Sequence, residues 1–415
     1  RSAQICGAGN INRLCSRDTL RVSSPMAVQV FLQARLAGIG EFLSAASTGD
    51  PEAVFLGRTH WVSLLMEVVP RALLAELGLS KMLLGTSGAG QFLLLLPEES
   101  RSAAEDFMTV AARGIEALSG GTLNLHWSST ENLGDWSEIR RRLDSEWSSK
   151  RDTPWAAGVL SNTSEARPDD SYFAVALAGL REAESIGWSP ETPERVLIGA
   201  GKHTWPLGSG PDALPFARHA APGDANSNPA HVAELAHRAS GNRTWGVLRG
   251  DVDNTGVLLR RATSIEEHIR LSVMLKQFFA GELEVVCSLS EYWRKVSVIY
   301  TGGDDFAIYG AWDALLAVGA EIERLFHRFT DANLAEQTGN EGKTITMAVA
   351  LAPSMGASLG AVFEEAGMRL EAARSADKDC IWVLGRTLEW KQLAEASALK
   401  GSLLRMIQDF GCSPQ

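Results

Sequence analysis

The chain has 415 residues, of which 45% are hydrophobic and 21% are charged, which is the composition of a folded protein. This length predicts roughly two to four domains. The formal net charge of −11 argues against a protein that coats nucleic acid by bulk charge, although it leaves room for a local basic groove.

The five cysteines are scattered, and no Cys-x-x-Cys pair occurs. This pattern is typical of a reducing compartment and argues against a disulfide framework or a cysteine zinc site. No apolar run reaches the roughly 20 residues that span a bilayer, and no signal peptide is visible. We therefore expect a cytoplasmic protein without a membrane partner.

The first third of the chain predicts an α/β unit. From Met26 to Ala46 the apolar spacing fits a helix or a strand that runs into one, and His60–Leu77 has helical spacing. Two short apolar runs, Met82–Leu84 and Phe92–Leu96, flank a glycine-rich turn and predict a β-hairpin. Further elements are predicted as a helix, a strand and a charged helix at Ser102–Leu118, Thr122–Trp127 and Asp135–Ser149.

The middle of the chain differs in composition from the first third. A helix is predicted over Ser171–Ser185. The segment Gly199–Pro229, rich in Gly, Pro and Asn, is typical of a linker or a loop-built insert.

The last third predicts a second α/β unit. A strand over Gly246–Arg249 leads into an acidic motif, a helix follows at Ser264–Ala280, and Val296–Thr301 and Phe306–Gly310 form a hairpin. The remaining elements are a helix, a strand, a helix and a strand at Asp313–Thr330, Ile345–Leu351, Leu359–Ser375 and Cys380–Leu384. The order β-α-β-β-α-β-α-β predicts a ferredoxin-like plait with an added strand.

The two units resemble each other as an internal repeat. Leu32–Leu43 aligns with Leu248–Leu259, and Ser87–Phe92 aligns with Thr301–Phe306 at nearly the same offset. Chance similarity between two plaits is the alternative explanation. If the repeat is real, the acidic positions of the second copy are filled in the first copy by Arg35, Ala37, Gly90 and Gln91. The first copy would then be unable to bind a metal.

The second copy predicts a metal site at Asp251, Asp304 and Asp305. The hairpin tip projects two adjacent carboxylates, while Gly302 and Gly303 allow a tight turn and a close approach of a nucleotide. Mg²⁺ prefers hard oxygen ligands from one or two carboxylates together with substrate phosphates. Two such ions can activate a 3′-hydroxyl and stabilise a leaving pyrophosphate. A solvated Asp-Asp turn without function is the alternative.

Neighbouring residues extend the predicted site. Asp253 is either a further ligand or a helix cap, and Asn254 completes the motif. Lys378 and Arg374, near the end of the last helix, are candidates for contacts with a triphosphate. The alternative for both is a solvated cation that complements the helix dipole.

Together these residues resemble the Csm-type large subunit of type III CRISPR effector complexes, the polymerase-cyclase subunit. The combination of Gly250–Asn254 with Gly302–Asp305 carries the resemblance. The segments Leu56–Trp61 and Thr86–Pro97 resemble the first palm of that family, and the likeness covers roughly residues 30–395.

The resemblance implies two palm domains and a division of the chain. The expected parts are an irregular segment at 1–25, a degenerate first palm at 26–150 and a helical and loop-rich linker without zinc cysteines at 151–245. A catalytic second palm at 246–390 and the start of a helical C-terminal domain at 391–415 follow.

The resemblance also implies an activity. Such a subunit converts ATP to cyclic oligoadenylate with Mg²⁺ or Mn²⁺ at Asp251, Asp304 and Asp305. Its expected partners are a guide RNA, the backbone and small subunits of the ribonucleoprotein, and a target RNA that activates it.

Two departures from the family pattern qualify these expectations. No His-Asp dipeptide occurs, so no HD nuclease site can be placed in this sequence. The segment between the palms holds no cysteine, so no zinc is expected there. Two other functions stay open: a stand-alone cyclic-dinucleotide (diguanylate-type) cyclase, which shares the plait, and a catalytically silent scaffold of the ribonucleoprotein.

Overall fold

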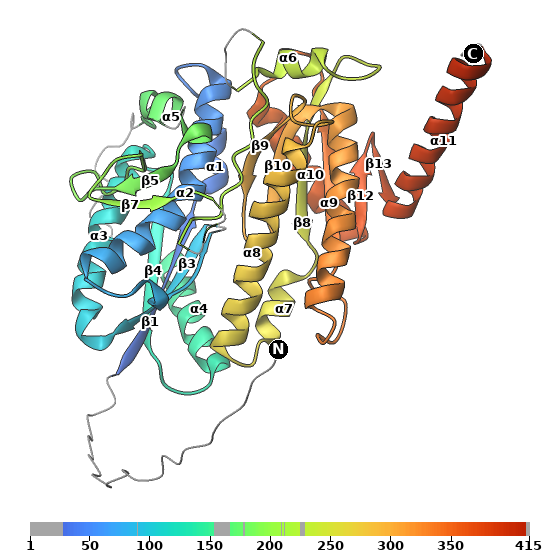
Figure 1. Cartoon of the computed structure of the whole chain (residues 1–415). Coiled ribbons are helices and arrows are strands. Elements are labelled where there is room, and N and C mark those ends of the chain that lie inside the picture. The colour runs from blue at the N-terminus through green and yellow to red at the C-terminus, as the bar shows by residue number, and fades with distance from the viewer. Residues whose placement is uncertain are drawn as a thin grey trace, which may run out of the picture.

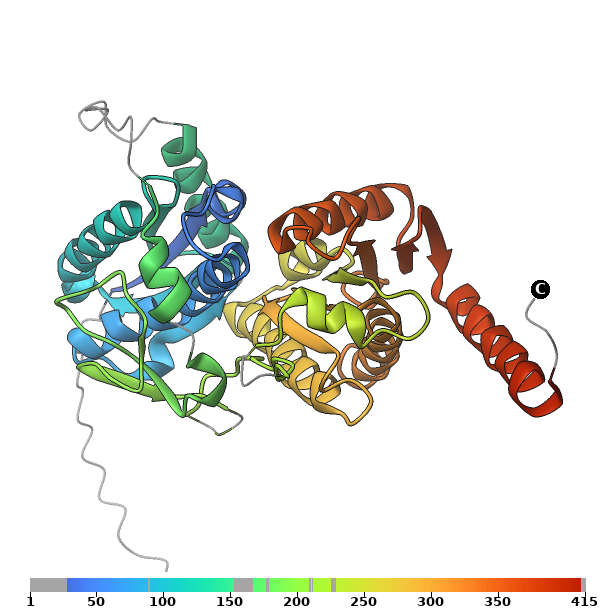
Figure 2. The ribbon, with the colours of Figure 1, turned by 90° about the horizontal axis from the view of Figure 1, so that it is seen from above.

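The structure is a computed structural model that describes residues 28–88, 90–152, 167–176, 179–208, 210, 212–224 and 229–411. Two α/β units lie side by side, each built around an antiparallel hairpin sheet (Figures 1 and 2). The predicted irregular segment 1–25 lies outside the described residues. No helix in the described part of the chain is long and apolar enough to cross a membrane.

The first unit has a four-stranded sheet in the order β2-β3-β1-β4. Its strands β1, β2, β3 and β4 span Gln29–Ala37, Leu84–Gly88, Gln91–Pro97 and Asn124–Glu131. Its helices α1, α2, α3 and α4 span Ile39–Ser44, Pro51–Glu76, Arg101–Leu118 and Trp136–Asp152. The 3₁₀ turns η1 and η2 span Lys81–Leu83 and Glu98–Ser100.

Helix α2 is the central helix of the molecule. It begins at Pro51, where the Asp50 side chain accepts a hydrogen bond from the Glu52 amide, and not at His60 as predicted. Its turns are buried on nearly every side, as expected for a helix enclosed by other elements. This enclosure explains the early start, because the first turns pack inside the protein although their sequence is less apolar.

The second unit has a six-stranded sheet in the order β13-β12-β11-β8-β10-β9. Strands β8 to β13 span Trp245–Val252, Val296–Thr301, Asp305–Ala311, Ile345–Leu351, Cys380–Val383 and Arg386–Glu389. Helices α7 to α11 span Thr255–Arg261, Ile265–Ser288, Trp312–Asn333, Leu359–Ala376 and Trp390–Phe410. The predicted element order is confirmed, with α7 and β13 added, and α11 extends away from the rest (Figure 2).

The linker is more regular than predicted. The expected helix Ser171–Ser185 is wrong: α5 spans Asp170–Ala176, and Ser185 begins a strand. Strands β5, β6 and β7 span Ser185–Trp188, Leu197–Ile198 and His203–Pro206. The 3₁₀ helix η3 spans Leu180–Glu182, and helix α6 spans Val232–His237. The three strands form a sheet in the order β6-β5-β7, of which only β7 lies within the predicted loop-built insert Gly199–Pro229. Strands of two to four residues are too short for hydrophobic alternation to reveal them.

The structure confirms the internal repeat in its register. In the first unit β1 pairs with β3 so that Arg35 lies opposite Gln91. In the second unit β8 pairs with β10 so that Asp251 lies opposite Asp305. Both central strands are flanked by antiparallel neighbours, β4 beside β1 and β11 beside β8. The alignment made from sequence therefore places equivalent residues at equivalent points of two sheets.

One hydrophobic core cluster spans both units, and a second cluster belongs mainly to the second unit. Phe55 of α2 meets Phe363 of α10 with ring centroids 5.2 Å apart. Beside this core, Lys276 of α8 forms an ion pair with the buried Glu67 of α2, and both contact Ser87. Because side chains of both units complete these contacts, the relative position of the two sheets is fixed by packing.

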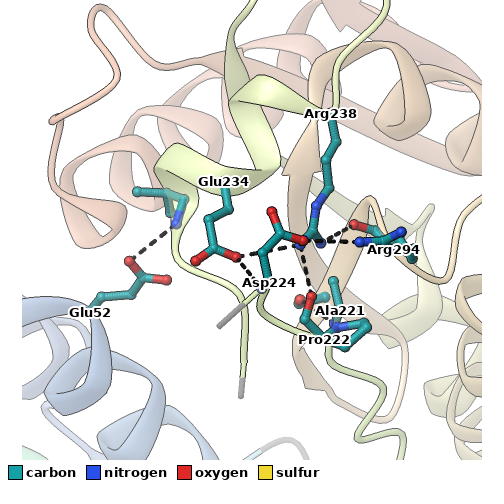
Figure 3. A network of polar contacts seen from close by, with 9 residues as sticks. Glu52, Ala221, Pro222, Asp224, Glu234, Arg238 and Arg294 are labelled. Carbon is teal, nitrogen blue, oxygen red and sulfur yellow. Dashed lines mark hydrogen bonds and ion pairs between the residues drawn. The ribbon is translucent and has the colours of Figure 1, made fainter. Parts of the chain in front are cut away.

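The segment that leads into α6 also joins the units (Figure 3). The Val232 amide donates to the Glu52 carboxylate over 3.4 Å, which links α6 to the start of α2. Arg238 then donates to the Arg294 carbonyl and to the Asp224 carboxylate. This polar network attaches the linker to the second unit just before β8 begins.

Candidate active site

Three carboxylates meet at the end of the central hairpin of the second unit. Asp251 lies on β8, directly opposite Asp305 at the start of β10. Asp304 precedes it in the hairpin, and its carbonyl accepts a hydrogen bond from the Val252 amide over 3.0 Å. The structure therefore brings together the three residues that the sequence singled out as metal ligands.

The glycine before the aspartates is a steric requirement. A Cβ atom at Gly302 would lie 1.8 Å from Oδ1 of Asp305, so no other residue fits there without moving that carboxylate. The Gly302 amide also donates to the Asp305 carbonyl over 2.7 Å, which closes the turn. The tight turn exposes the hairpin tip, including Gly303, toward the space between the units.

The carboxylates raise one another's pKa. Burial, and after it the charge of Asp304, raises the pKa of Asp251 to about 8. Burial and the neighbouring Asp305 raise the pKa of Asp304 to about 6. Burial also raises the pKa of Asp305. Converging carboxylates are unfavourable without a compensating cation, so this arrangement fits a site for positive charge.

The chemistry of the donors fits a divalent cation, while each carboxylate is engaged with a neighbour. Among the described residues no group of three or more His, Cys, Asp or Glu side chains is gathered closely enough to hold a metal ion. Arg374 of α10 donates to Oδ2 of Asp251 over 3.0 Å, and the Tyr300 hydroxyl donates to Oδ2 of Asp305 over 2.7 Å. Hard oxygen donors on two adjacent strands suit Mg²⁺ or Mn²⁺, and a bound ion would take the place of Arg374 at Asp251.

Asp253 has a role that the sequence did not predict. Its buried carboxylate accepts hydrogen bonds from the hydroxyls of Thr344 and Thr346, both over 2.8 Å, and from the Asp379 amide over 3.0 Å. It lines none of the cavities around the other carboxylates, and it does not cap α7, whose N-cap is Asn254. Asp253 thus ties β8 to β11 and to the loop before β12, and its expected contact with a cofactor stays a prediction.

The two predicted phosphate-binding cations lie at different distances from the centre. Arg374 contacts Asp251 directly. Lys378 donates to the Asn254 side chain over 2.5 Å, at the edge of the site. Asn254 has a φ of 58°, a left-handed conformation that turns the chain between β8 and α7. Both cations therefore lie near the carboxylates, and Arg374 is the nearer of the two.

A cavity joins the carboxylates to the first unit. Its second-unit wall includes Asp251, Asp304 and Asp305. Its first-unit wall comes from α1, α2 and the tip of the degenerate hairpin, and it is lined by Ile39, Gly40, Leu43, Thr59, Val62, Ser63 and Gly90. No pattern in the sequence predicts this wall, because contacts between domains leave no periodic signal.

A second cavity between the units is rich in basic side chains. It is open to Gly303 and Asp304 on one side. Its basic lining residues are Arg35, Arg71, Lys81, Arg140, Arg260 and Lys276. Arg35, at the position equivalent to Asp251, forms an ion pair with Asp144 over 2.7 Å. At the positions of the three acids the first unit therefore has Arg35 and two uncharged residues, Gly90 and Gln91, and its cavity is lined by several basic side chains.

Two plaits, of which one keeps its carboxylate hairpin, define a palm-type protein. Residues 244–382 match the family model of the second palm domain of Cas10/Cmr2. A Cas10/Csm1 single-strand-specific deoxyribonuclease of CRISPR subtype III-A from Mycobacterium tuberculosis is 25% identical over 394 residues, covering 73% of this chain and 49% of the relative. The corresponding protein of Methanocaldococcus jannaschii is 34% identical over 115 residues, covering 25% of this chain and 14% of the relative.

Solved structures show the same fold. An apo Csm1–Csm4 cassette superposes with a TM-score of 0.74 at 18% identity, covering 92% of this chain and 59% of the other. A Csm1–Csm4 cassette in complex with AMPPNP gives a TM-score of 0.69 at 19% identity, covering 88% of this chain and 57% of the other. Residues 244–382 therefore correspond to the second palm domain of Cas10/Cmr2, and the chain as a whole resembles the Cas10/Csm1 large subunits of subtype III-A. It spans about half the length of the M. tuberculosis relative.

Proposed function

We propose that the chain is the cyclic oligoadenylate synthetase subunit of an RNA-guided type III CRISPR complex. In this proposal Asp251, Asp304 and Asp305 hold two Mg²⁺ or Mn²⁺ ions and ATP is the substrate. The observation that carries it is the direct pairing of Asp251 with Asp305 beside Asp304, in the one unit of the repeat that has kept its acids.

The residues of the chain would divide the work of nucleotidyl transfer. Divalent ions, when bound, supply activation of the attacking 3′-hydroxyl and stabilisation of the leaving pyrophosphate. Gly302 and Gly303 leave room for a nucleotide at the hairpin tip. Arg374 lies beside Asp251 and is placed to contact a phosphate once an ion occupies that carboxylate. Lys378, at the rim, would add positive charge toward the triphosphate.

The first palm would contribute to binding without a metal. The cavity beside the carboxylates has an apolar wall from the first unit, which suits an adenine ring, and polar Thr59 and Ser63 beside it. The basic cavity on the other side of the hairpin suits phosphates. We infer a composite pocket in which two nucleotides meet between the palms. A nucleotide-bound structure with one ATP, held by residues 246–390 alone, would contradict this inference.

The related structures support adenine nucleotides as substrates. Csm1–Csm4 cassettes at 17–18% identity are described in complex with cA4, with cA3, with pppApA and with pppApApA. These ligands belong to those proteins, whose fold this chain shares. By extension, we propose backbone and small subunits, a guide RNA and an activating target RNA as partners of this chain.

Two other functions are separable by their products. A stand-alone dinucleotide cyclase shares the plait but works as a homodimer of one domain, whereas this chain carries both palms in one polypeptide. A silent scaffold would need no carboxylates at the hairpin. The relatives are named single-strand-specific deoxyribonucleases, yet no His-Asp dipeptide is present in this sequence.

The test is product analysis on the chain purified with its co-expressed complex. The complex is incubated with ATP and Mg²⁺ or Mn²⁺, with and without RNA complementary to the bound guide, and analysed by mass spectrometry. The proposal expects cyclic oligoadenylates that depend on the RNA. Products from GTP without RNA would indicate the dinucleotide cyclase. No product from a complex that still binds its target RNA would indicate the scaffold.

A further inference from the structure

A short chain of contacts runs behind the carboxylate of Asp305. The Tyr300 hydroxyl donates to Oδ2 of Asp305 over 2.7 Å, and Nη2 of Arg249 donates to the Tyr300 hydroxyl over 3.4 Å. The three residues come from β10, β9 and β8, which are neighbours in the sheet. All three also line the cavity that contains Asp251. We call Arg249 and Tyr300 the Arg–Tyr relay.

The far end of the relay is held by α10. The Arg249 guanidinium lies 4.2 Å from the centre of the Phe363 ring. A Cβ atom at Gly367 would lie 2.4 Å from Nη1 of Arg249, so the helix leaves a gap where the guanidinium passes. Stacking on one side and a glycine on the other leave Arg249 little freedom to turn away from Tyr300.

The other oxygen of Asp305 is also confined. Oδ1 of Asp305 packs against Gly302, where a Cβ atom would lie only 1.8 Å away. With Oδ2 held by Tyr300 and Oδ1 packed on Gly302, the carboxylate plane has one orientation. Partners that orient a ligand in this way raise its affinity for a metal, because the ordering is completed before the ion arrives.

The degenerate palm supplies an internal comparison. In the second unit Arg249 and Tyr300 both pair with Ala307, on either side of it. In the first unit the equivalent residues are Gln33 and Thr86, which both pair with Leu93. The relay is therefore lost in the same unit that has lost its carboxylates. A purely structural role in the plait would not require this association, since the first sheet folds without the relay.

We propose that Tyr300 and Arg249 are positioning residues that hold Asp305 in the orientation in which it binds a divalent cation. The inference rests on the proposed function, since it presumes that an ion binds at the hairpin. Both residues also line the cavity proposed for the nucleotide, but in this role they act on the metal through Asp305.

The experiment measures Mn²⁺ binding to the full chain by isothermal titration calorimetry, without nucleotide. Tyr300→Phe removes one hydroxyl and keeps the ring, and Arg249→Met keeps much of the aliphatic length. We expect each to raise the Kd for Mn²⁺ about 10-fold, as orienting partners of metal ligands typically do. Tyr309→Phe is the matched control, because Tyr309 is a buried tyrosine of the same sheet whose hydroxyl has no hydrogen-bond partner. It should leave the Kd unchanged.

A further variant, Asp305→Ala, separates failure of this inference from failure of the proposed function. If Asp305→Ala abolishes Mn²⁺ binding and Tyr300→Phe leaves it unchanged, the relay has no positioning role. If the unaltered chain binds no Mn²⁺, or Asp305→Ala binds it equally well, the metal site itself is wrong. Should Arg249→Met lower the thermal unfolding midpoint markedly, the conservative Tyr300→Phe decides the question alone. In the assembled complex, Tyr300→Phe should raise the Mn²⁺ concentration for half-maximal activity more than it lowers kcat.

Discussion

The two palms of this chain have the same register and differ in charge at equivalent positions. At the positions where the second palm has Asp251 opposite Asp305, the first has Arg35 opposite Gln91. Arg35 is held by Asp144, whereas Asp251 is held by Arg374 from a different helix. The comparison teaches that the fold tolerates either charge at the hairpin, so the acids of the second palm are kept for a reason other than folding. A divalent cation is the physical reason that fits them.

The largest expected effect comes from removing the acids. Changing Asp304 and Asp305 together to alanine should lower cyclic oligoadenylate formation by about 10³-fold or more, because the lost metal ions stabilise the transition state by several kcal/mol. Mass spectrometry of the reconstituted complex measures this loss. The matched change in the first palm, Arg35→Ala with Gln91→Ala, should have a much smaller effect. Equal losses from both pairs would refute the division of labour.

The next effect concerns the contact between the palms. Lys276→Met leaves Glu67 buried without its partner from the other unit, since the Glu67 side chain is only 4% exposed. Because Glu67 keeps its ion pair with Arg71 over 2.8 Å, the loss should be about 1–3 kcal/mol, below the about 3–5 kcal/mol of a buried charge left with no partner. Chemical denaturation measures the free energy of unfolding. Lys391→Met, which breaks an exposed pair with Glu395, is the control and should change it by about 1 kcal/mol or less. Similar values for the two variants would mean that the palms are not coupled by this pair.

A smaller effect is expected at Arg374. A charged hydrogen bond contributes about 1.5–3 kcal/mol, so Arg374→Ala should raise the KM for ATP by about 10-fold to 100-fold. Steady-state kinetics over a range of ATP concentrations give this value. Lys378→Ala, at the rim, should raise KM less. The reverse order would place the triphosphate at the rim of the site and away from Asp251.

The smallest effect is a pH dependence of stability. His60 of α2 lies against the second palm, and burial lowers its pKa from 6.5 to about 4. The unfolded chain therefore binds this proton first, so the stabilisation is complete above pH 6.5 and is lost as the pH falls toward 4. The slope should be at most about 1.4 kcal/mol per pH unit. His60→Gln should flatten the stability profile between these values, whereas His327→Gln, at an exposed position, should not. If the His60→Gln variant has an unchanged stability profile, burial of His60 between the palms does not cause this pH dependence.

Much of the fold was predictable because local patterns in the sequence determine its helices and strands. Strand β11 and helix α10 fall at or within a residue of their predicted bounds, and the repeat alignment matches residues that occupy equivalent positions in the two sheets. Hairpins and amphipathic helices leave periodic signals, and an Asp-Asp pair after two glycines is rare enough to be informative. The family assignment from the same motifs is also confirmed.

The parts that could not be predicted depend on contacts between distant residues. Asp253 lies two residues from Asp251 in the sequence, yet hydrogen bonds from Thr344 and Thr346 hold its buried carboxylate inside the fold. The Arg–Tyr relay needs three strands in register, which no single segment reveals. The sheet β6-β5-β7 consists of strands too short to show a period.

The most direct test of the account is to locate manganese in crystals of the chain soaked with Mn²⁺ and a non-hydrolysable ATP analogue. Anomalous scattering identifies the ions without reference to activity. The account predicts manganese between Asp251, Asp304 and Asp305, and none beside Arg35 and Gln91. Manganese bound at the first palm, or none at the second, would contradict it.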